Sequence, residues 1–176
     1  MARASDAANF FIDAAQRCDA EPMTNLRLQK LMYFAQAWSI VRNGCPLFDE
    51  ELRAWELGPV VPSVYQKYKI CGGNPIADAD DAFDYSVFTE EELSVLTDVF
   101  VQYGKFTTAQ LVNLCHRPGE PWEKTARNGV ITKACMKDAF LRKTPLSGMG
   151  DILSNLPEEG YHDESGRLVL PSDWER

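Results

Sequence analysis

Histidine and closely spaced cysteines, the usual residues of structural metal sites, are scarce in this 176-residue chain. It has two histidines, His116 and His162, and five cysteines that share no short repeated spacing. Zinc sites need Cys or His pairs a few residues apart, and disulfide frameworks need an even, regular set of cysteines. The sequence therefore predicts no metal site and no disulfide framework, and no motif in it points to another cofactor. The cysteines are interpreted as reduced, buried thiols.

Long apolar runs are missing as well. No window approaches the roughly 20 uninterrupted apolar residues of a membrane-spanning helix. Residues 1–6 lack the basic start and the apolar run of a secretory signal. Both absences predict a cytoplasmic protein with no membrane partner. With 45% hydrophobic and 25% charged residues, the chain has the composition of one globular domain.

Basic residues are outnumbered, with 18 Lys and Arg against 26 Asp and Glu and a net charge of −8. Residues 75–98 contain eight acidic side chains and no basic one, whereas residues 117–143 contain seven Lys or Arg against three acids. Nucleic-acid binding depends on neutralising phosphates with clustered cations. The charge balance therefore argues against a nucleic-acid partner, although it leaves one local basic segment.

Catalytic signatures are absent. The sequence has no serine-hydrolase, phosphate-loop or dinucleotide-binding motif. Cys115 and His116 are adjacent, so on a helix their side chains diverge by about 100° and cannot pair as nucleophile and base. Cys115 also shares an apolar stripe with Leu111. A core thiol is the favoured interpretation, an enzyme with a Cys115 nucleophile is the alternative, and no catalytic residue is predicted.

The apolar periodicity predicts a mainly α protein, with a short strand or small β element. A helix over residues 25–42 is capped by Thr24, with an apolar face over half of its circumference and Gln29, Lys30, Tyr33 and Gln36 on the other side. Residues 52–55 are expected to form a strand that Gly58-Pro59 ends. Further helices are expected from Ser5 or Asp6 to about residue 19, from Pro62 to about 70, after Thr89, after Thr107, in a turn at Trp122, and after Thr132 with Ala134, Cys135, Ala139 and Leu141 inward.

The two helices around Gly104 offer an alternative function. Their spacing resembles a helix-turn-helix, which predicts a DNA-binding regulator. The second helix, however, carries Gln110 and Asn113 but no Lys or Arg. The basic residues of 117–143 are equally suited to phosphate, to an acidic protein surface or to the acidic loop of this chain.

Trp122 is the first interface candidate, because Trp and Arg dominate binding hot spots. Pro118 and Pro121 turn the chain on either side of it, so we expect His116, Trp122 and Arg127 to lie together. In the alternative, Trp122 fills the bottom of the helical bundle and His116 bonds a backbone carbonyl.

Trp55 and Tyr65 complete the candidate partner-binding set. Trp55 ends the expected strand, where burial in the core and exposure at an interface are equally compatible with the pattern. Tyr65 lies in the helix that follows Pro62.

Three segments carry a family resemblance. Residues 26–38 (LRLQKLMYFAQAW), residues 54–65 (AWELGPVVPSVY), and Cys115-His116 followed by Pro121-Trp122 resemble the Panacea domain, also called the SocA-like antitoxin domain. The resemblance covers roughly residues 5–143, which divides the chain into a single compact domain at 1–143 and a C-terminal extension at 144–176. Cys115 stands where the family pattern often has Thr.

The resemblance implies a non-enzymatic antitoxin, which binds and neutralises a toxin encoded beside it. Similar proteins occur on bacterial chromosomes and prophages, with diverse toxin partners. Some members are thought to act as adaptors that present the toxin to a cytoplasmic AAA+ protease. Neither sequestration nor adaptor action is selected by these residues, nor is an oligomeric state.

The extension is acidic, with seven acids against two basic residues over 151–176. Residues 161–170 have the pattern of a small hairpin. Two roles stay open for this segment: contact with a specific partner through a strand edge, or simple coverage of the domain.

Overall fold

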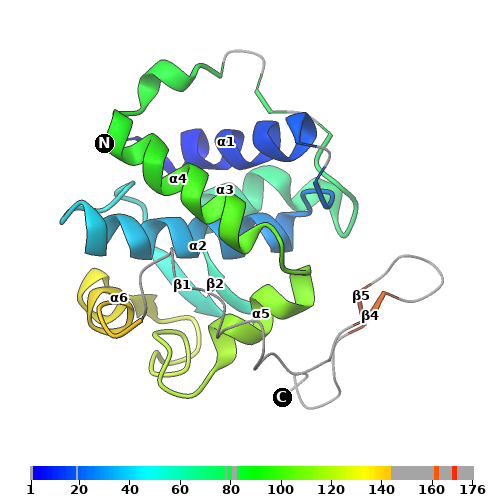
Figure 1. Ribbon diagram of the computed structural model, residues 1–176. Coiled ribbons are helices and arrows are strands. Elements are labelled where there is room, and N and C mark those ends of the chain that lie inside the picture. The colour runs from blue at the N-terminus through cyan, green and yellow to red at the C-terminus, as the bar shows by residue number, and fades with distance from the viewer. Residues whose placement is uncertain are drawn as a thin grey trace.

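The computed structural model describes residues 2–18, 20–77, 79–80, 83–143, 161–162 and 168–169. The predicted mainly α fold is confirmed, with a small sheet beside the helices (Figure 1). The helices are α1 (Ala4–Arg17), α2 (Asn25–Arg42), α3 (Pro62–Tyr68), α4 (Glu90–Tyr103), α5 (Thr108–His116) and α6 (Lys133–Phe140), with short 3-10 helices η1 (Lys69–Cys71) and η2 (Tyr85–Val87). The strands are β1 (Leu52–Trp55), β2 (Gly58–Val60), β3 (Val130–Ile131), β4 (Tyr161–His162) and β5 (Leu168–Val169).

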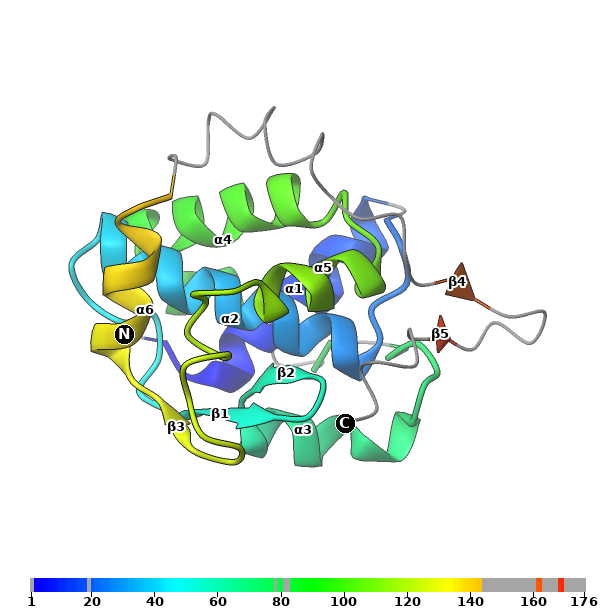
Figure 2. The ribbon, with the colours of Figure 1, turned by 90° about the horizontal axis from the view of Figure 1, so that it is seen from below.

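Helix α2 is the centre of the domain. In Figure 1, α1 and α4 lie on one side of it and the sheet, α5 and α6 on the other, and Figure 2 shows the same enclosure from below. Thr24 caps it as predicted, because its hydroxyl accepts a hydrogen bond from the Arg27 backbone N–H at 3.2 Å. The helix contacts every other α-helix and β2.

The expectation of a polar outer face on α2 was wrong. Its polar residues are as inaccessible as its apolar ones, with at most 1% of the surface exposed at Gln29, Lys30, Tyr33 and Gln36. Packing on both sides of the helix leaves it no solvent face. Buried polar groups are tolerated when they are hydrogen-bonded, and Gln29, Lys30 and Gln36 each bond to a backbone group outside α2.

Two buried polar side chains of α2, Arg27 and Gln36, bond to two separate chain segments. The Arg27 guanidinium donates to the carbonyls of Phe106 at 2.7 Å and Gly104 at 2.8 Å. The Gln36 amide accepts from the Leu47 N–H at 2.8 Å and donates to the Phe48 carbonyl at 2.8 Å. The turn between α4 and α5 and the segment before β1 are therefore both held by α2.

The sheet has the order β2-β1-β3, with both pairs antiparallel. The prediction that Gly58-Pro59 ends the strand was wrong, because Gly58 starts β2 opposite Trp55. Gly58 has a φ of +104°, which suits glycine after the two-residue turn. Pro59 lies on an edge strand, where its missing N–H costs no sheet hydrogen bond.

The polar edge of β2 is covered by α2. Lys30 donates from Nζ to the Pro59 backbone carbonyl at 3.1 Å, and the Gln29 side-chain Oε1 accepts from the Val61 N–H at 2.9 Å. An uncovered edge strand invites pairing with another chain. The α2 side chains therefore occupy positions that a partner strand would otherwise use.

Two helix details differ from the sequence expectations. Helix α1 begins at Ala4, because Arg3 is the N-cap and Asp6 is the third helical residue, accepting from the Arg3 N–H at 2.9 Å. The region at Trp122 forms hydrogen-bonded turns rather than a helix. In a capping box the acid occupies the third helical position. Asp6 has that position, whereas the sequence pattern was interpreted as placing it at the N-cap.

The inward face of α6 was also assigned wrongly. Met136 and Phe140 are its buried residues, whereas Leu141 is 58% exposed and Ala134 is exposed. Cys135 and Ala139 are half-buried. The helix packs against Tyr33, Phe34 and Trp38 through the Phe140 ring, with centroid distances of 5.3–6.2 Å. The large Phe140 ring, rather than the number of apolar residues on each side of α6, determines which face of the helix is buried.

In the C-terminal extension, β4 and β5 pair antiparallel, with Tyr161 opposite Val169. This confirms the pairing expected of a hairpin for those four residues. The remainder of residues 144–176, and with it the predicted partner contact of the extension, lies outside the described residues.

Across the described ranges, none of the helices combines the length and apolarity needed to cross a membrane.

The two arginines of α2 give a matched test of burial. The Arg27 side chain is 1% exposed and contacts Glu21 as well as two carbonyls, whereas Arg42 pairs with Asp98 at 36% exposure. Arg27→Ala leaves buried carbonyls unsatisfied and should lower the free energy of unfolding by about 3 kcal/mol or more. Arg42→Ala should cost about 1 kcal/mol or less. Urea denaturation measures both, and equal losses would contradict a supporting role for Arg27.

Candidate partner-binding site

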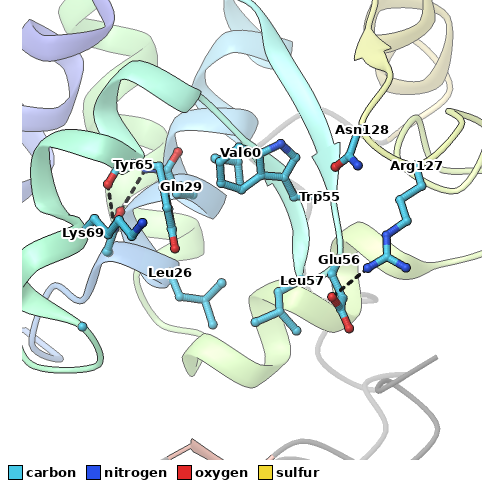
Figure 3. A pocket seen from close by; sticks show the side chains of 12 residues that line it. Leu26, Gln29, Trp55, Glu56, Leu57, Val60, Tyr65, Lys69, Arg127 and Asn128 are labelled. Atoms are coloured by element: carbon cyan, nitrogen blue, oxygen red, sulfur yellow. Dashed lines mark hydrogen bonds and ion pairs between the residues drawn. The ribbon is translucent and has the colours of Figure 1, made fainter.

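An open pocket lies between the β1–β2 hairpin and α3, with a volume of about 580 Å³ (Figure 3). It has the size of pockets that receive a side chain or small ligand. Helix α2 forms its base, and the loop before β3 forms one end. Its lining residues are Asn25, Leu26, Gln29, Trp55, Glu56, Leu57, Val60, Tyr65, Lys69, Gly72, Arg127 and Asn128.

Trp55 and Tyr65 form the aromatic wall. Their rings meet edge to face, with centroids 4.8 Å apart and an angle of 76° between the planes. Along β1 burial alternates, so Leu52 and Ala54 face the core while Arg53 and Trp55 stay half-exposed. Strand alternation therefore decides the open question about Trp55: its ring lines the pocket.

Arg127 and Asn128 form the opposite end in Figure 3. The Asn128 N–H donates to the Ala54 carbonyl at 2.7 Å, and its φ of 62° is a conformation that Asn tolerates well. Arg127 pairs with Glu56 at 3.0 Å, with 69% and 49% of the two side chains exposed. The loop is thus held on β1 by its backbone, while the Arg127 charge remains at the surface.

His116 and Trp122 lie together, but neither residue lines the pocket. Their rings are parallel, with centroids 3.7 Å apart. Trp122 is half-buried against the core and donates from Nε1 to the Trp55 carbonyl at 2.7 Å. Of the three residues expected to meet, His116 and Trp122 stack, whereas Arg127 reaches the pocket rim and pairs with Glu56. Trp122 supports the backbone of the aromatic wall rather than lining the pocket.

Lys30 and His116 approach the same glycine. A Cβ at Gly58 would lie 2.8 Å from Lys30 Nζ and 3.5 Å from His116 Nε2. Burial lowers the pKa of Lys30 to about 8. Burial, together with the nearby Lys30 charge, lowers the pKa of His116 to about 4. A side chain at position 58 would push the buried Lys30 ammonium aside, whereas His116 would be in ordinary contact, so glycine suits this position for space as well as for its positive φ.

Cys115 is a core thiol, as favoured from the sequence. It is fully buried, and burial raises its pKa to about 12. A nucleophilic cysteine needs the opposite, an accessible thiol with a lowered pKa. The geometry therefore gives no support to Cys115 catalysis.

Helix α5 is poorly placed to read DNA. Its Thr108, Ala109, Leu111, Val112, Leu114 and Cys115 are buried in the domain. Three basic side chains of residues 117–143 are engaged with acids of this chain: Arg127 with Glu56, Lys133 with Asp49 and Lys143 with Glu120. A recognition helix needs a free face in the groove, so this arrangement argues against the regulator alternative.

Sequence reasoning missed several pocket residues. Leu57 and Glu56 form a two-residue turn before Gly58, which is a hairpin signal that could have been used. Asn128-Gly129 is a similar turn signal beside Arg127. Lys69 carries no such local signal, since its place at the rim depends on how α3 packs.

Substitutions of Trp122 distinguish a structural role of this side chain from direct contact with a partner. Trp122→Ala removes the stack on His116 and the hydrogen bond to Trp55, so we expect a loss of about 2–3 kcal/mol in the free energy of unfolding. Trp122→Phe keeps an aromatic ring and should cost about 1 kcal/mol. Thermal or urea denaturation measures both. Unchanged stability in Trp122→Ala would instead identify Trp122 as a pure contact residue.

Lys30 should make stability depend on pH above neutrality. Its pKa is about 8 in the folded chain, against 10.5 as the ordinary value. Between these pH values the unfolded chain binds the extra proton, so the free energy of unfolding rises with pH. Relative to Lys30→Met, the wild type should gain up to about 3 kcal/mol from pH 8 to 10.5. A difference that stays constant in urea titrations over this range would contradict the lowered pKa.

Comparison with known proteins places the chain in a family. The sequence model described as "Antitoxin SocA-like, Panacea domain" matches residues 28–123, which span α2, the hairpin, α3, α4, α5 and Trp122. A curated relative, "Antitoxin SocA" of Caulobacter vibrioides (strain NA1000 / CB15N), is 31% identical over 171 residues, covering 85% of this chain and 90% of that protein. No solved structure matches. The chain belongs to the SocA-like Panacea domain family of antitoxins.

Proposed function

We propose that this protein is the antitoxin of a bacterial toxin–antitoxin pair and neutralises its cognate toxin by direct protein–protein binding. Family membership and the name of the curated relative support the antitoxin role. The proposed role is non-catalytic, and the full burial of the Cys115 thiol supports it. The toxin is expected to be encoded beside this protein.

The open pocket lined by Trp55 and Tyr65 is the observation that supports this location for the binding site. Trp and Tyr are the residue types most enriched at interface hot spots, where they lie in preformed hollows. The Trp55 and Tyr65 rings are available here because both are half-buried, Trp55 on the outward side of β1 and Tyr65 in the middle of α3. Hydrogen bonds from Asn25 and Trp122 also fix the backbone that carries the two rings.

The pocket is held in shape before any partner arrives. Asn25 donates from Nδ2 to the Tyr65 carbonyl at 3.1 Å, and Trp122 holds the Trp55 carbonyl. A preorganised site binds more tightly because less conformational freedom is lost on association. This rigidity supports stable sequestration of a toxin.

Adaptor action is a further form of the same proposal. A toxin bound in the pocket would then be handed to a AAA+ protease, and its cellular amount would fall. Direct sequestration leaves the toxin amount unchanged while growth is restored. Toxin immunoblots during co-expression distinguish the two forms.

Trp55→Ala is the decisive change. The Trp122 hydrogen bond goes to the Trp55 backbone, so it survives this substitution and the fold should be kept. The wild-type protein should co-purify with the product of the neighbouring reading frame and restore growth when both are expressed. Trp55→Ala should weaken binding by more than about 2 kcal/mol.

Val101→Ala is the matched control, because Val101 is a 50% exposed apolar residue of α4 that does not line the pocket. It should bind like the wild type. Absence of a complex and of growth rescue by the wild type would refute the proposed function. A complex that Trp55→Ala leaves intact would move the site away from the pocket.

A further inference from the structure

We propose that the Trp55–Tyr65 pocket recognises an acidic segment of the toxin, by taking up one apolar side chain, best an aromatic one, flanked by carboxylates. This inference rests on the proposed function and assigns the chemistry of the bound segment. Two independent features of the pocket support this proposal. One is its apolar interior, and the other is the net positive charge of its rim.

The interior offers apolar contact and few open polar groups. Leu26, Leu57 and Val60 join the two rings in its lining. The polar group at the base is already engaged, because the Gln29 amide accepts from Val61 N–H at 2.9 Å and donates to Asn25 Oδ1 at 3.1 Å. A polar side chain entering the pocket would lose its water without replacement hydrogen bonds. The interior therefore selects an apolar side chain.

Aromatic rings fit this interior best. The two wall rings meet edge to face at 4.8 Å, which leaves faces and edges for a third ring. Ile70, which follows the lining residue Lys69 in the chain, is a 94% exposed apolar side chain.

The rim has the opposite charge from the rest of the chain. Lys69 and Arg127 line it against the single acid Glu56, while the whole chain has a net charge of −8. Glu56 offsets Arg127 through their ion pair. Lys69 has no ion pair within the part of the chain that the structure describes.

Three of the rim groups can donate hydrogen bonds to a bound segment. An ammonium, a guanidinium and the Asn128 amide at the edge of a hydrophobic pocket suit carboxylates beside the inserted side chain. Because the chain as a whole carries a net negative charge, the rim also sets the orientation in which an acidic segment can approach. A basic segment would be attracted to the chain as a whole but repelled at this rim.

Peptides test the pocket without the toxin. The probe is acetyl-Asp-Phe-Asp-amide, titrated into the ¹⁵N-labelled full chain at low salt. We expect shifts at the Trp55 indole and the Asn128 amide, with binding at least five-fold stronger than for acetyl-Lys-Phe-Lys-amide. Acetyl-Asp-Ser-Asp-amide and the Trp55→Ala protein should show no saturable shifts. Equal or stronger binding of the lysine peptide, or no shifts with the aspartate peptide, overturns the inference.

Charge variants test the same rim in the toxin complex. Lys69→Glu should weaken toxin binding about ten-fold, and Glu56→Gln should tighten it about three-fold by releasing Arg127. Lys137→Glu, an equal charge reversal at an exposed residue of α6 outside the pocket, should change binding less than two-fold. Added salt should reduce the difference between Lys69→Glu and wild type.

The outcomes separate the two proposals. If the wild type binds the toxin but Lys69→Glu tightens the complex, the toxin segment is basic; this inference fails while the proposed function stands. An unchanged complex in both Lys69→Glu and Glu56→Gln also overturns the inference. If the wild type binds no toxin, the proposed function fails, and the peptide titration alone decides the chemistry of the pocket.

Discussion

The fold depends on the burial of polar side chains along α2. Arg27, Gln29, Lys30 and Gln36 have almost no exposed surface. A buried polar group costs free energy unless it is hydrogen-bonded, and a buried charge costs more. Each of these side chains is bonded to a backbone group of another segment: the α4–α5 turn, the β2 edge or the segment before β1. One helix therefore determines where three separate connections lie, and breaking one bond leaves a buried group unsatisfied.

The candidate site inherits its shape from this arrangement. Gln29 holds the backbone at Val61, where β2 passes into α3, so the hairpin and α3 diverge from a fixed point and leave the pocket between them. Trp122, stacked on His116, fixes the other end through the Trp55 carbonyl. Gln29 and Trp122 of the family motifs thus build the scaffold, whereas Trp55 and Tyr65 of the same motifs line the pocket. At the rim, Lys69 and Arg127 lie outside the motif segments.

Local rules predicted the helix starts well. Thr24, Thr89, Thr107 and Thr132 each cap a helix, because a capping hydroxyl bonds within its own turn. The mainly α class and the strand at 52–55 followed from periodicity in the same way. The polar side of α2 and the inward face of α6 were assigned wrongly. Burial depends on what packs from distant parts of the chain, and hydrophobic pattern alone does not contain that information.

For the site, the sequence by itself determined the residue types: two aromatic rings, an arginine beside a turn, and a Cys–His pair too poor for catalysis. Its motifs also determined the family. Only the tertiary structure decided which of these residues meet. It separated Trp122 from the pocket, placed Trp55 and Tyr65 edge to face within it, and brought Lys69 to the rim. The reason is physical: residue chemistry is carried by each position alone. A binding surface requires contacts between segments up to 71 residues apart, which only packing around α2 creates.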